Sequence, residues 1–417
     1  MFSPRGKIRT NFLNRKFGKN ENFAKNFRSS KIWEIKILIL AGGFATRLWP
    51  LTESRAKPLL LLNGETILAK ILAKIPPNLE IFLLTNKKFA PDFHAEIKNL
   101  QRKNVQIFCE DSFSDNEKLG ALGAVSTAIK NFEIKENIAI FAGDNLLENF
   151  NFSQILCGEN EAKILVREAE SFFAARKFGV AEIDSQNFVK NFSEKPAQPK
   201  SKLISTGFCA IGQNFFSILH DFAAKNPDAL GAIFTEFLRH KKKIRAEKIN
   251  GQWFDVGSFS AYLAAHKFFQ QQKNEKIIKK INFKKLAKNF KIEKKIDEKK
   301  LKKICEFCEK NNFKKEILEK KIAEKFGIEK KIVVKILENE KITENKNLKI
   351  EKNFFAGQNF IGKNCQIKNS KILNSIIYPN TKIENCQISE SVIDENCVLR
   401  GIDINQKLIR KNTNLQF

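Results

Sequence analysis

Tyrosine, methionine and long apolar segments are scarce in this sequence of 417 residues, which holds two Tyr and one Met beside 39 Phe. No apolar run approaches the ~18 residues of a membrane-spanning helix, so we expect no membrane segment. The first 30 residues are basic but lack the continuous apolar stretch of a secretory signal peptide. We therefore expect a cytoplasmic protein, with an organellar transit peptide as the alternative explanation of the basic start.

Paired cysteines are also few. The eight cysteines are scattered, and only Cys305 and Cys308 form a CxxC motif. A structural zinc site needs four ligands, and neither a second pair nor a nearby histidine completes one here. We interpret the two residues as small apolar positions on a helix, and the thiols as reduced, in keeping with a cytoplasmic location.

Acidic residues are outnumbered, and the basic excess is concentrated in two segments. The formal net charge is +28. Residues 1–31 carry nine Lys or Arg against one acid, and residues 271–346 carry 25 Lys against 13 acids. The other 310 residues hold only +8. The charge that would suit nucleic acid therefore lies in accessory segments, away from the motifs described below.

Four stretches of different composition follow one another. Residues 1–33 are polar and without periodicity, which predicts a disordered basic extension. Residues 34–269 alternate short apolar runs with helical patterns, which predicts an α/β domain with a mixed, mostly parallel sheet. Residues 270–346 are rich in Lys and Glu with apolar residues at helical spacing, and residues 347–410 form short repeats. Within the α/β stretch the patterns predict strands at 35–40, 80–84, 105–108 and 138–141, and helices at 66–75 and 258–269.

The repeats place Ile, Leu or Val at intervals of roughly six residues among Asn, Ser and Lys. The positions are Ile361, Ile367, Leu373, Ile377, Ile383, Ile388, Ile393 and Val398. Short repeats of this kind predict a solenoid in which each coil buries its apolar residue against the next. Because a solenoid of about three coils is short, we expect a neighbour to cap it.

A glycine turn beside two cations is the strongest functional signal. The predicted strand at 35–40 leads into Gly42-Gly43, and Arg47 and Lys57 follow. Two glycines let the backbone turn sharply and approach a ligand without obstruction by a Cβ atom. Backbone amides in such a turn cradle phosphate oxygens, and the two cations supply the positive charge that a triphosphate requires.

The whole string resembles the signature of the sugar-phosphate nucleotidyltransferase family. It reads Gly42-Gly43-Phe44-Ala45-Thr46-Arg47-Leu48, then Pro50-Leu51-Thr52, then Lys57-Pro58. The family has glycine where Ala45 stands, and we expect the loop to pass Ala45 in an ordinary conformation because alanine disfavours positive φ. Other landmarks resemble the family in order across residues 36–268. They are Glu117-Lys118-Leu119-Gly120-Ala121, Gly143-Asp144-Asn145, Phe178-Gly179-Val180, Glu194-Lys195-Pro196, Ser205-Thr206-Gly207-Phe208 and Trp253-Phe254-Asp255-Val256-Gly257.

The resemblance implies a Rossmann-like fold and transfer of a nucleotidyl group from a nucleoside triphosphate to a sugar-1-phosphate, with release of pyrophosphate. It implies Mg²⁺ as the cofactor, with Asp144 and Asp255 as its ligands. In this scheme Arg47 grips the departing pyrophosphate, while Lys57 and Lys195 neutralise the α-phosphate and the incoming sugar phosphate. The implied catalytic residues are Arg47, Lys57, Lys195 and Asp144. The implied nucleotide-binding residues are Leu40, Ala41, Gly42, Gly43, Thr46, Arg47 and Gly120, and the implied sugar-phosphate-binding residues are Gly179, Glu194, Lys195 and Thr206.

The base and the sugar stay open, because they depend on pocket shape and on loop contacts near Glu110 and Gly120. The Lys-Pro-Leu form and the Glu-Lys-Leu-Gly loop favour dTTP or UTP with glucose-1-phosphate, and GTP with mannose-1-phosphate is the alternative.

Two other classes of function stay open. One is a regulatory protein that keeps the fold of the family but has lost turnover. The other is a nucleic-acid-binding protein that acts through the Lys-rich insert. The insert has a helix-turn-helix pattern, but its second helix at 330–338 offers no Arg, Gln or Asn to base edges, which favours a spacer.

The C-terminal repeat resembles the left-handed β-helix that many members of the family carry. In relatives such a domain assembles subunits or transfers acyl groups. Acyl transfer there uses a histidine as general base, and the four histidines lie at 94, 220, 240 and 266, outside the repeat. We therefore expect the repeat to serve assembly into a homo-oligomer, or regulation.

Overall fold

The computed structural model describes residues 35–280, 349–351, 354–356 and 359–416. These residues form two compact units. The first holds 35–44, 55–60 and 66–255, and the second holds 45–54, 61–65 and the described residues from 256 onward. The extension predicted at 1–33, the CxxC pair and most of the Lys-rich segment lie outside the described residues. Within the described ranges, no helix is both long and apolar enough to cross a membrane.

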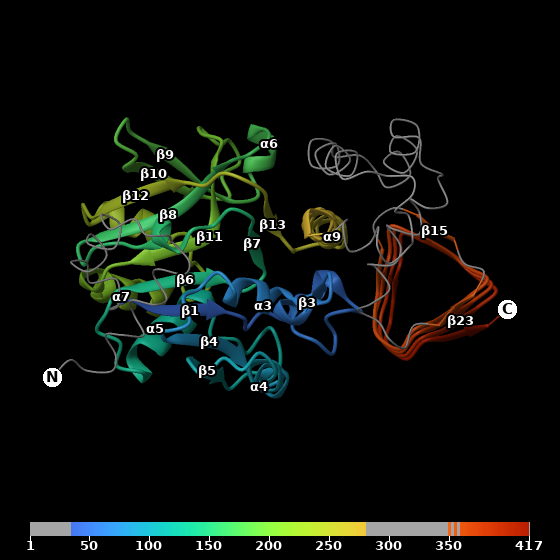
Figure 1. Cartoon of the computed structure of the whole chain (residues 1–417). Coiled ribbons are helices and arrows are strands. Elements are labelled where there is room, and N and C mark those ends of the chain that lie inside the picture. Colours follow the sequence, from blue (N-terminus) through green and yellow to red (C-terminus); the bar gives the residue numbers. More distant parts are fainter. Residues whose placement is uncertain (1–34, 281–348, 352–353, 357–358, 417) are drawn as a thin grey trace. The chain divides into compact units, whose positions relative to one another are not determined.

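The first unit is built on a nine-stranded mixed sheet (Figure 1). Its central strands β6 (Ile138–Ala142), β1 (Lys36–Leu40), β4 (Ile81–Asn86) and β5 (Val105–Glu110) run parallel in that order. Strands β1, β4 and β6 are nearly continuous runs of buried apolar residues, as expected for parallel strands covered on both faces. All four strands begin within a residue of the predicted positions.

Antiparallel strands complete this sheet on the far side of β6. Strand β11 (Leu203–Ile211) pairs with β6, with β8 (Glu161–Glu168) and with β9 (Gly179–Ile183), and β9 pairs with β10 (Val189–Glu194). Strand β12 (Lys243–Lys248) runs parallel to β8. The predicted mixed α/β sheet is thus confirmed. A separate two-stranded ribbon joins β7 (Asn145–Leu147) to β13 (Trp253–Asp255).

Helices pack on the sheet around one apolar core, to which α5, α7 and α8 contribute Leu122, Leu219 and Ile233. The predicted helix at 66–75 is shorter than expected: Thr66 caps it by accepting from the Ala69 N–H at 3.0 Å, and it ends at Leu72. The helices and 3-10 turns are η3 (Lys57–Leu59), α3 (Ile67–Leu72), α4 (Ala90–Asn99), α5 (Ala121–Asn131), η4 (Phe152–Ile155), α6 (Phe172–Ala175), η5 (Gln213–Phe215), α7 (Phe216–Lys225) and α8 (Ile233–Arg239).

The second unit combines two short segments from the front of the chain with its C-terminal part. The 3-10 turn η2 (Thr46–Leu48) lies in the first segment. Strand β2 (Leu61–Leu62) pairs with β3 (Glu65–Thr66) across Asn63-Gly64, where positive φ at both turn residues suits a tight hairpin. Helix α9 (Phe259–Lys280) starts as predicted but continues beyond the predicted end at 269.

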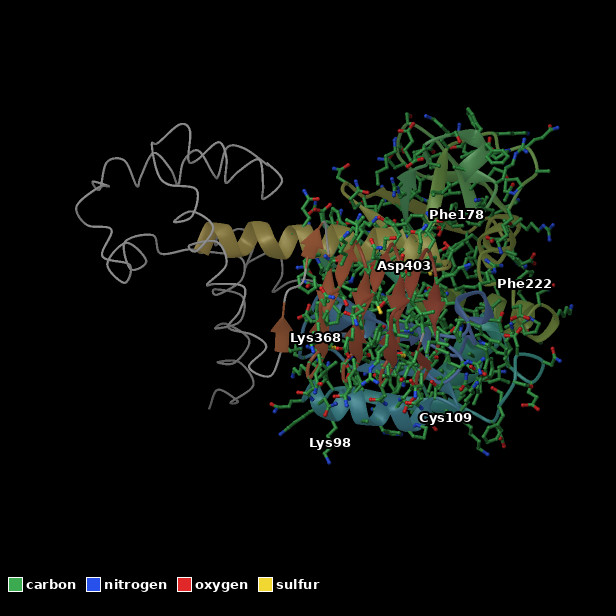
Figure 2. The ribbon with its side chains drawn as sticks, turned by 90° about the vertical axis from the view of Figure 1, so that its right-hand side faces the viewer. Lys98, Cys109, Phe178, Phe222, Lys368 and Asp403 are labelled. Carbon is green, nitrogen blue, oxygen red and sulfur yellow. The ribbon has the colours of Figure 1, made fainter. Side chains whose placement is uncertain are left out.

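The repeats form three parallel ladders, and the predicted left-handed β-helix is confirmed (Figure 1). The coil has 16 residues: Ile367 pairs with Ile383, and Ile383 with Leu399. Outward side chains repeat the register, so that Gln387 bonds Asp403 (labelled in Figure 2). The ladders are β14 (Lys349–Glu351), β17 (Gln366–Lys368), β20 (Lys382–Glu384), β23 (Val398–Arg400) and β26 (Asn414–Gln416); β15 (Phe354–Ala356), β18 (Lys371–Leu373), β21 (Gln387–Ser389) and β24 (Asp403–Asn405); and β16 (Phe360–Ile361), β19 (Ile376–Ile377), β22 (Val392–Ile393) and β25 (Leu408–Ile409).

The predicted six-residue spacing is wrong in detail. Inward positions follow steps of six, five and five residues, so Ile372 and Leu399 are buried, whereas Leu373 is 39% exposed and Val398 is only half-buried. The cause is a residue with positive φ at each corner, which turns the chain after a short strand. These corner residues are Asn364, Asn369, Asn374, Asn380, Asn385, Glu390, Asn396, Gly401, Gln406 and Asn412.

Candidate active site

The predicted glycine turn follows β1, at the centre of the parallel strands of the first unit. The Leu40 carbonyl accepts from the Gly143 N–H at 2.9 Å, and the Ala41 N–H donates to the Leu84 carbonyl at 2.8 Å. Neighbouring strands on both sides thus fix the backbone that enters the turn. At Gly43 no described atom lies within 4 Å of the position that a Cβ would take, so a ligand can approach the backbone there.

Two side chains from neighbouring strands hold the next residue, Gly42. Asn86 Nδ2 donates to the Gly42 carbonyl at 2.9 Å. Glu110, at the end of β5, is 6% exposed, and its Oε1 lies 3.2 Å from the position of a Cβ at Gly42. Its Oε2 accepts from the Leu119 N–H at 3.1 Å. Glu110 therefore braces the glycine turn against the loop that leads to Gly120, a role that its place at a strand end did not reveal in the sequence.

Gly120 stands at the start of α5 with φ +77°. A Cβ there would lie 2.6 Å from the backbone carbonyl of Pro227, so only glycine fits. The same carbonyl accepts from the N–H groups of Leu122 and Gly123 at 2.8 and 2.9 Å. The loop predicted to face the base is therefore pinned to the first turn of α5 and to Pro227.

The prediction of an ordinary backbone at Ala45 is wrong. Ala45 adopts the left-handed conformation, with φ 52° and ψ 42°. This costs an alanine about 1–2 kcal/mol, and two hydrogen bonds to its carbonyl offset the cost. The Leu48 N–H donates at 3.0 Å and Thr52 Oγ1 donates at 2.7 Å. The loop keeps the turn of the family pattern without its glycine.

Thr46 and Arg47 form the exposed side of η2, in the second unit. The next residue, Leu48, is fully buried and anchors the turn. This alternation turns the hydroxyl and the guanidinium outward, where charged ligands can reach them.

Lys57 and Asp144 form an ion pair in the first unit. Lys57 Nζ lies 2.6 Å from Asp144 Oδ2, and their side chains are 16% and 30% exposed. Lys57 begins η3, and Asp144 directly follows β6 and Gly143. The carboxyl end of a parallel strand is where open α/β sheets bind ligands, so this pair stands where phosphate chemistry is expected.

Asp255 is brought to the same place by the small ribbon. In the antiparallel pairing of β7 with β13, Asp255 lies opposite Asn145, the neighbour of Asp144. Two carboxylates that are 111 positions apart in the sequence are thereby placed on adjoining segments. The described residues contain no group of three or more His, Cys, Asp or Glu that would hold a metal by themselves.

Thr206 lies beneath this ribbon rather than in the open. Its carbonyl accepts from Asn145 Nδ2 at 2.7 Å and from Trp253 Nε1 at 3.1 Å. Its hydroxyl donates to the Leu165 carbonyl at 3.0 Å, and the residue is fully buried. Thr206 thus ties the segments that carry Asp144 and Asp255 to the sheet, and its side chain is engaged inside it.

Gly179 and Glu194 lie opposite each other in β9 and β10. A Cβ at Gly179 would lie 2.9 Å from Glu194 Oε2 and 2.4 Å from the Phe192 ring, so the glycine makes room for the carboxylate. Burial raises the pKa of the Glu194 carboxyl, against an opposing effect of the nearby Lys195. Lys195 has φ +47°, and its side chain is 68% exposed.

The geometry divides the predicted residues into groups. Lys57, Asp144 and Asp255 come together beside the glycine turn, and Gly179, Glu194 and Lys195 form a second cluster on the antiparallel strands. Among the described residues, no hydrogen bond or ion pair joins Lys195 to Asp144 or Lys57. The first group sets one lysine beside two aspartates, and the second sets one lysine beside one glutamate, so each offers a cation next to carboxylates.

The chain resembles known proteins over this region. Residues 36–272 match the protein family described as Nucleotidyl transferase. The chain is 32% identical over 255 residues to "Bifunctional protein GlmU" of Methanococcus maripaludis, covering 59% of this chain and 56% of that protein. It is 27% identical over 234 residues to "Mannose-1-phosphate guanylyltransferase catalytic subunit beta" of Drosophila melanogaster, covering 55% and 61%. It is 27% identical over 263 residues to "Glucose-1-phosphate adenylyltransferase 1" of Vibrio vulnificus, covering 55% and 65%. The matches thus span little more than half the length of these relatives.

Proposed function

The chain belongs to the nucleotidyl transferase family, and from this premise we propose that it transfers a nucleotidyl group from a nucleoside triphosphate to a sugar-1-phosphate. Pyrophosphate leaves, and a nucleoside-diphosphate sugar forms. The observation that carries this proposal is the ion pair of Lys57 with Asp144 beside the glycine turn, at the carboxyl ends of β1 and β6. The similarity to a mannose-1-phosphate guanylyltransferase subunit and to a glucose-1-phosphate adenylyltransferase supports it.

The reaction needs positioning and charge more than a protein nucleophile. An oxygen of the sugar phosphate attacks the α-phosphorus in line, while the bond from that phosphorus to the pyrophosphate oxygen breaks. We assign Lys57 and Lys195 to neutralise the α-phosphate and the incoming sugar phosphate, and Arg47 to hold the departing pyrophosphate. The glycine turn, with Thr46 and Gly120, is assigned to the nucleotide. Gly179, Glu194, Lys195 and the segment at Thr206 are assigned to the sugar phosphate.

We propose Mg²⁺ as the cofactor, held by Asp144 and Asp255. Mg²⁺ prefers oxygen ligands and is commonly bound by one or two carboxylates together with substrate phosphates and water. The two carboxylates on adjoining segments fit that donor set. When bound, the ion supplies charge stabilisation to the phosphates. Lys57 compensates the charge of Asp144, which keeps the half-buried carboxylate paired.

Replacing Asp144 tests the proposal. Asp144→Ala should leave a folded protein in which pyrophosphate release falls at least about 10²-fold, because a stabilising group is lost at the reacting phosphates. Asp92→Asn is the matched control: it removes an exposed carboxylate in the first turn of α4, outside the proposed site. The assay measures pyrophosphate with each nucleotide and sugar phosphate. Full activity in folded Asp144→Ala would remove the metal assignment.

For the substrates we propose dTTP or UTP with glucose-1-phosphate, and GTP with mannose-1-phosphate as the alternative. The loop from Glu110 to Gly120 supports a single, rigid base site, since both of its ends are pinned. A panel of four nucleotides against the two sugar phosphates decides between the two. We further propose a cytoplasmic location, where these metabolites are made, and a homo-oligomer assembled through the β-helix.

A further inference from the structure

The only two tyrosines of the chain meet in the second unit. Tyr262 comes from α9 and Tyr378 directly follows β19 of the β-helix. Both residues are fully buried, and their hydroxyl oxygens lie 2.9 Å apart. A buried hydroxyl needs a hydrogen-bond partner, so the two residues depend on one another.

Leu61 of β2 closes these hydroxyls into a ring of hydrogen bonds. Tyr262 Oη donates to the Leu61 carbonyl at 2.6 Å, and the Leu61 N–H donates to Tyr378 Oη at 3.0 Å. The remaining hydroxyl proton, that of Tyr378, then bridges to Tyr262 Oη. Both backbone polar groups of Leu61 are thus hydrogen-bonded to tyrosines. Leu61 is four residues beyond Lys57 in the chain.

The turn of the same hairpin also rests on the β-helix. A Cβ at Gly64 would lie 3.3 Å from Cε2 of Phe360, a residue of β16. The Phe360 ring also meets His266 of α9 edge to face, with centroids 5.8 Å apart. Residues 61–65 are therefore held at both the strand and the turn.

The segment that carries Arg47 is tied to the β-helix as well. Arg410 Nη2, in the last coil, lies 3.1 Å from Glu53 Oε2. The side chains are 63% and 41% exposed, so this pair is the weaker attachment. The β-helix thus contacts both front segments that belong to its unit, on either side of Lys57 in the sequence.

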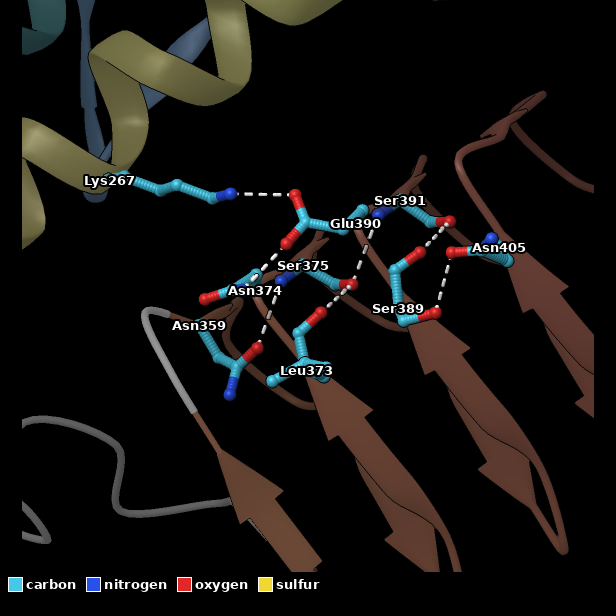
Figure 3. Close-up of polar contacts among 9 residues, drawn as sticks. All are labelled: Lys267, Asn359, Leu373, Asn374, Ser375, Ser389, Glu390, Ser391 and Asn405. Carbon is cyan, nitrogen blue, oxygen red and sulfur yellow. Dashed lines mark hydrogen bonds and ion pairs between the residues drawn. The ribbon is translucent and has the colours of Figure 1, made fainter. Parts of the chain in front are cut away.

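One corner of the β-helix departs from its repeat in a way that strengthens this attachment. Glu390 has φ +47° at a corner where the preceding coil has Asn374. Its Oε2 accepts from Lys267 Nζ of α9 at 2.6 Å, and its Oε1 accepts from Asn374 Nδ2 at 2.6 Å (Figure 3). A glutamate in the left-handed region is costly, and the bond to Lys267 is what a shorter asparagine would lose.

We propose that the β-helix positions the two front segments of its unit: Tyr378 holds residues 61–65, which begin four positions after Lys57, and Arg410 holds residues 45–54, which carry Arg47. This inference rests on the proposed function. It gives the β-helix a role within its own chain, besides any assembly. Tyr262, Tyr378 and Arg410 act as positioning residues, since they touch the loop segments and not the substrates.

The test compares Tyr378→Phe and Arg410→Ala with the unchanged full chain. Tyr378→Phe breaks the ring of hydrogen bonds with Tyr262 and Leu61. We expect kcat to fall about tenfold, with a raised KM for the triphosphate, because small displacements of positioned groups slow the reaction strongly. Arg410→Ala removes only a surface pair, so the expected loss is about two- to threefold. Amide hydrogen exchange should quicken in peptides covering 45–54 and 61–65, and not in the peptide of β1.

Two controls separate positioning from general damage. Ile388→Val trims the β-helix core, and Arg400→Ala removes a surface cation that pairs with Glu384 inside the β-helix at 3.5 Å. Both should leave kcat and the exchange of 45–65 unchanged. Tyr378→Phe behaving like Ile388→Val in both readouts would overturn the inference while the transfer activity stands. A wild-type chain inactive on every substrate pair would overturn the proposed function, and the exchange data would still decide the positioning.

Discussion

The two units differ in how they use left-handed backbone. In the sheet unit, residues other than glycine adopt positive φ at isolated turns, such as Asn187 and Lys195. In the described part of the β-helix they do so at every corner except that of Gly401. Corner side chains bond one another from coil to coil, as Asn364 does with Asn380 at 3.1 Å. In the β-helix, hydrogen bonds between equivalent corner residues thus offset the cost of left-handed backbone. An isolated left-handed residue in the sheet unit needs its own local hydrogen bonds.

This difference tells where function is to be sought in each unit. In the β-helix a departure from the repeat stands out. Glu390 stands where the preceding coil has Asn374, and it bonds α9. Tyr378 stands where the neighbouring coils have Gly362 and Asp394, and it bonds Leu61. In the sheet unit every position is unique, and only the meeting of distant residues marks the site. Lys57 with Asp144 is such a meeting.

The largest loss of unfolding free energy should come from truncating a buried side chain in either core. Ile377→Ala in the β-helix and Ile140→Ala in β6 both remove a fully buried side chain, and each should cost about 2–5 kcal/mol of unfolding free energy. Because a solenoid transmits stability only between neighbouring coils, Ile377→Ala should loosen β16, β19 and β22 more than the rest. Ile140→Ala should loosen the whole sheet. Hydrogen exchange resolved by peptide measures both patterns.

A uniform loss of protection across all coils in Ile377→Ala would break the comparison. It would mean that the β-helix unfolds as one cooperative block, like the sheet. Leu373→Ala, at an exposed position next to the inward Ile372, is the control and should change exchange little.

A smaller effect is expected at Ala45, the left-handed alanine. Ala45→Gly should raise the unfolding free energy by about 0.5–1 kcal/mol, because relief of the left-handed strain exceeds the added chain entropy of glycine. Denaturant melts measure the change. Asn380→Ala places alanine at a left-handed corner and should lose about 1 kcal/mol. If Ala45→Gly is destabilising instead, the left-handed backbone costs alanine less at this position than the added chain entropy of glycine.

The sequence alone predicted what depends on local pattern and order. Strand β1, the turn at Gly42, and the place of Asp144 after β6 follow from apolar runs and from the position of glycine and aspartate behind them. The coils of the β-helix could also be predicted, because buried apolar residues recur at short intervals along the chain. These features need few contacts between distant residues, so a single sequence carries them.

The features that were predicted wrongly or missed depend on contacts that the apolar pattern does not show. The left-handed Ala45 is held by Thr52, and the brace at Glu110 depends on which strands become neighbours. The 16-residue coil follows from the spacing of the corner asparagines. This spacing is present in the sequence, but the apolar residues alone do not show it. The ring of hydrogen bonds between the tyrosines and Leu61 joins residues more than 300 positions apart. Neither local sequence contains a pattern that predicts this contact.

The smallest predicted effect is a change in the pH dependence of stability at Glu194, in the sheet unit. Since burial raises the pKa of Glu194 in the folded state, its folded form holds the proton above about pH 4.5, where the unfolded chain has lost it. Its contribution is therefore present at low pH and is lost as pH rises through the folded pKa. Glu194→Gln, which stays neutral, should gain stability relative to the wild type as pH rises above the ordinary carboxyl pKa of about 4.5. Thermal melts across this range measure the trend.

Glu168 provides the opposite case in the same sheet. The hydrogen bond from Lys202 lowers the pKa of Glu168, so its contribution is present above the unfolded pKa and is lost as pH falls. Glu168→Gln should therefore lose stability relative to the wild type as pH rises through the same region. Parallel trends for the two variants would mean that the position of Glu194 opposite Gly179 does not desolvate its carboxyl.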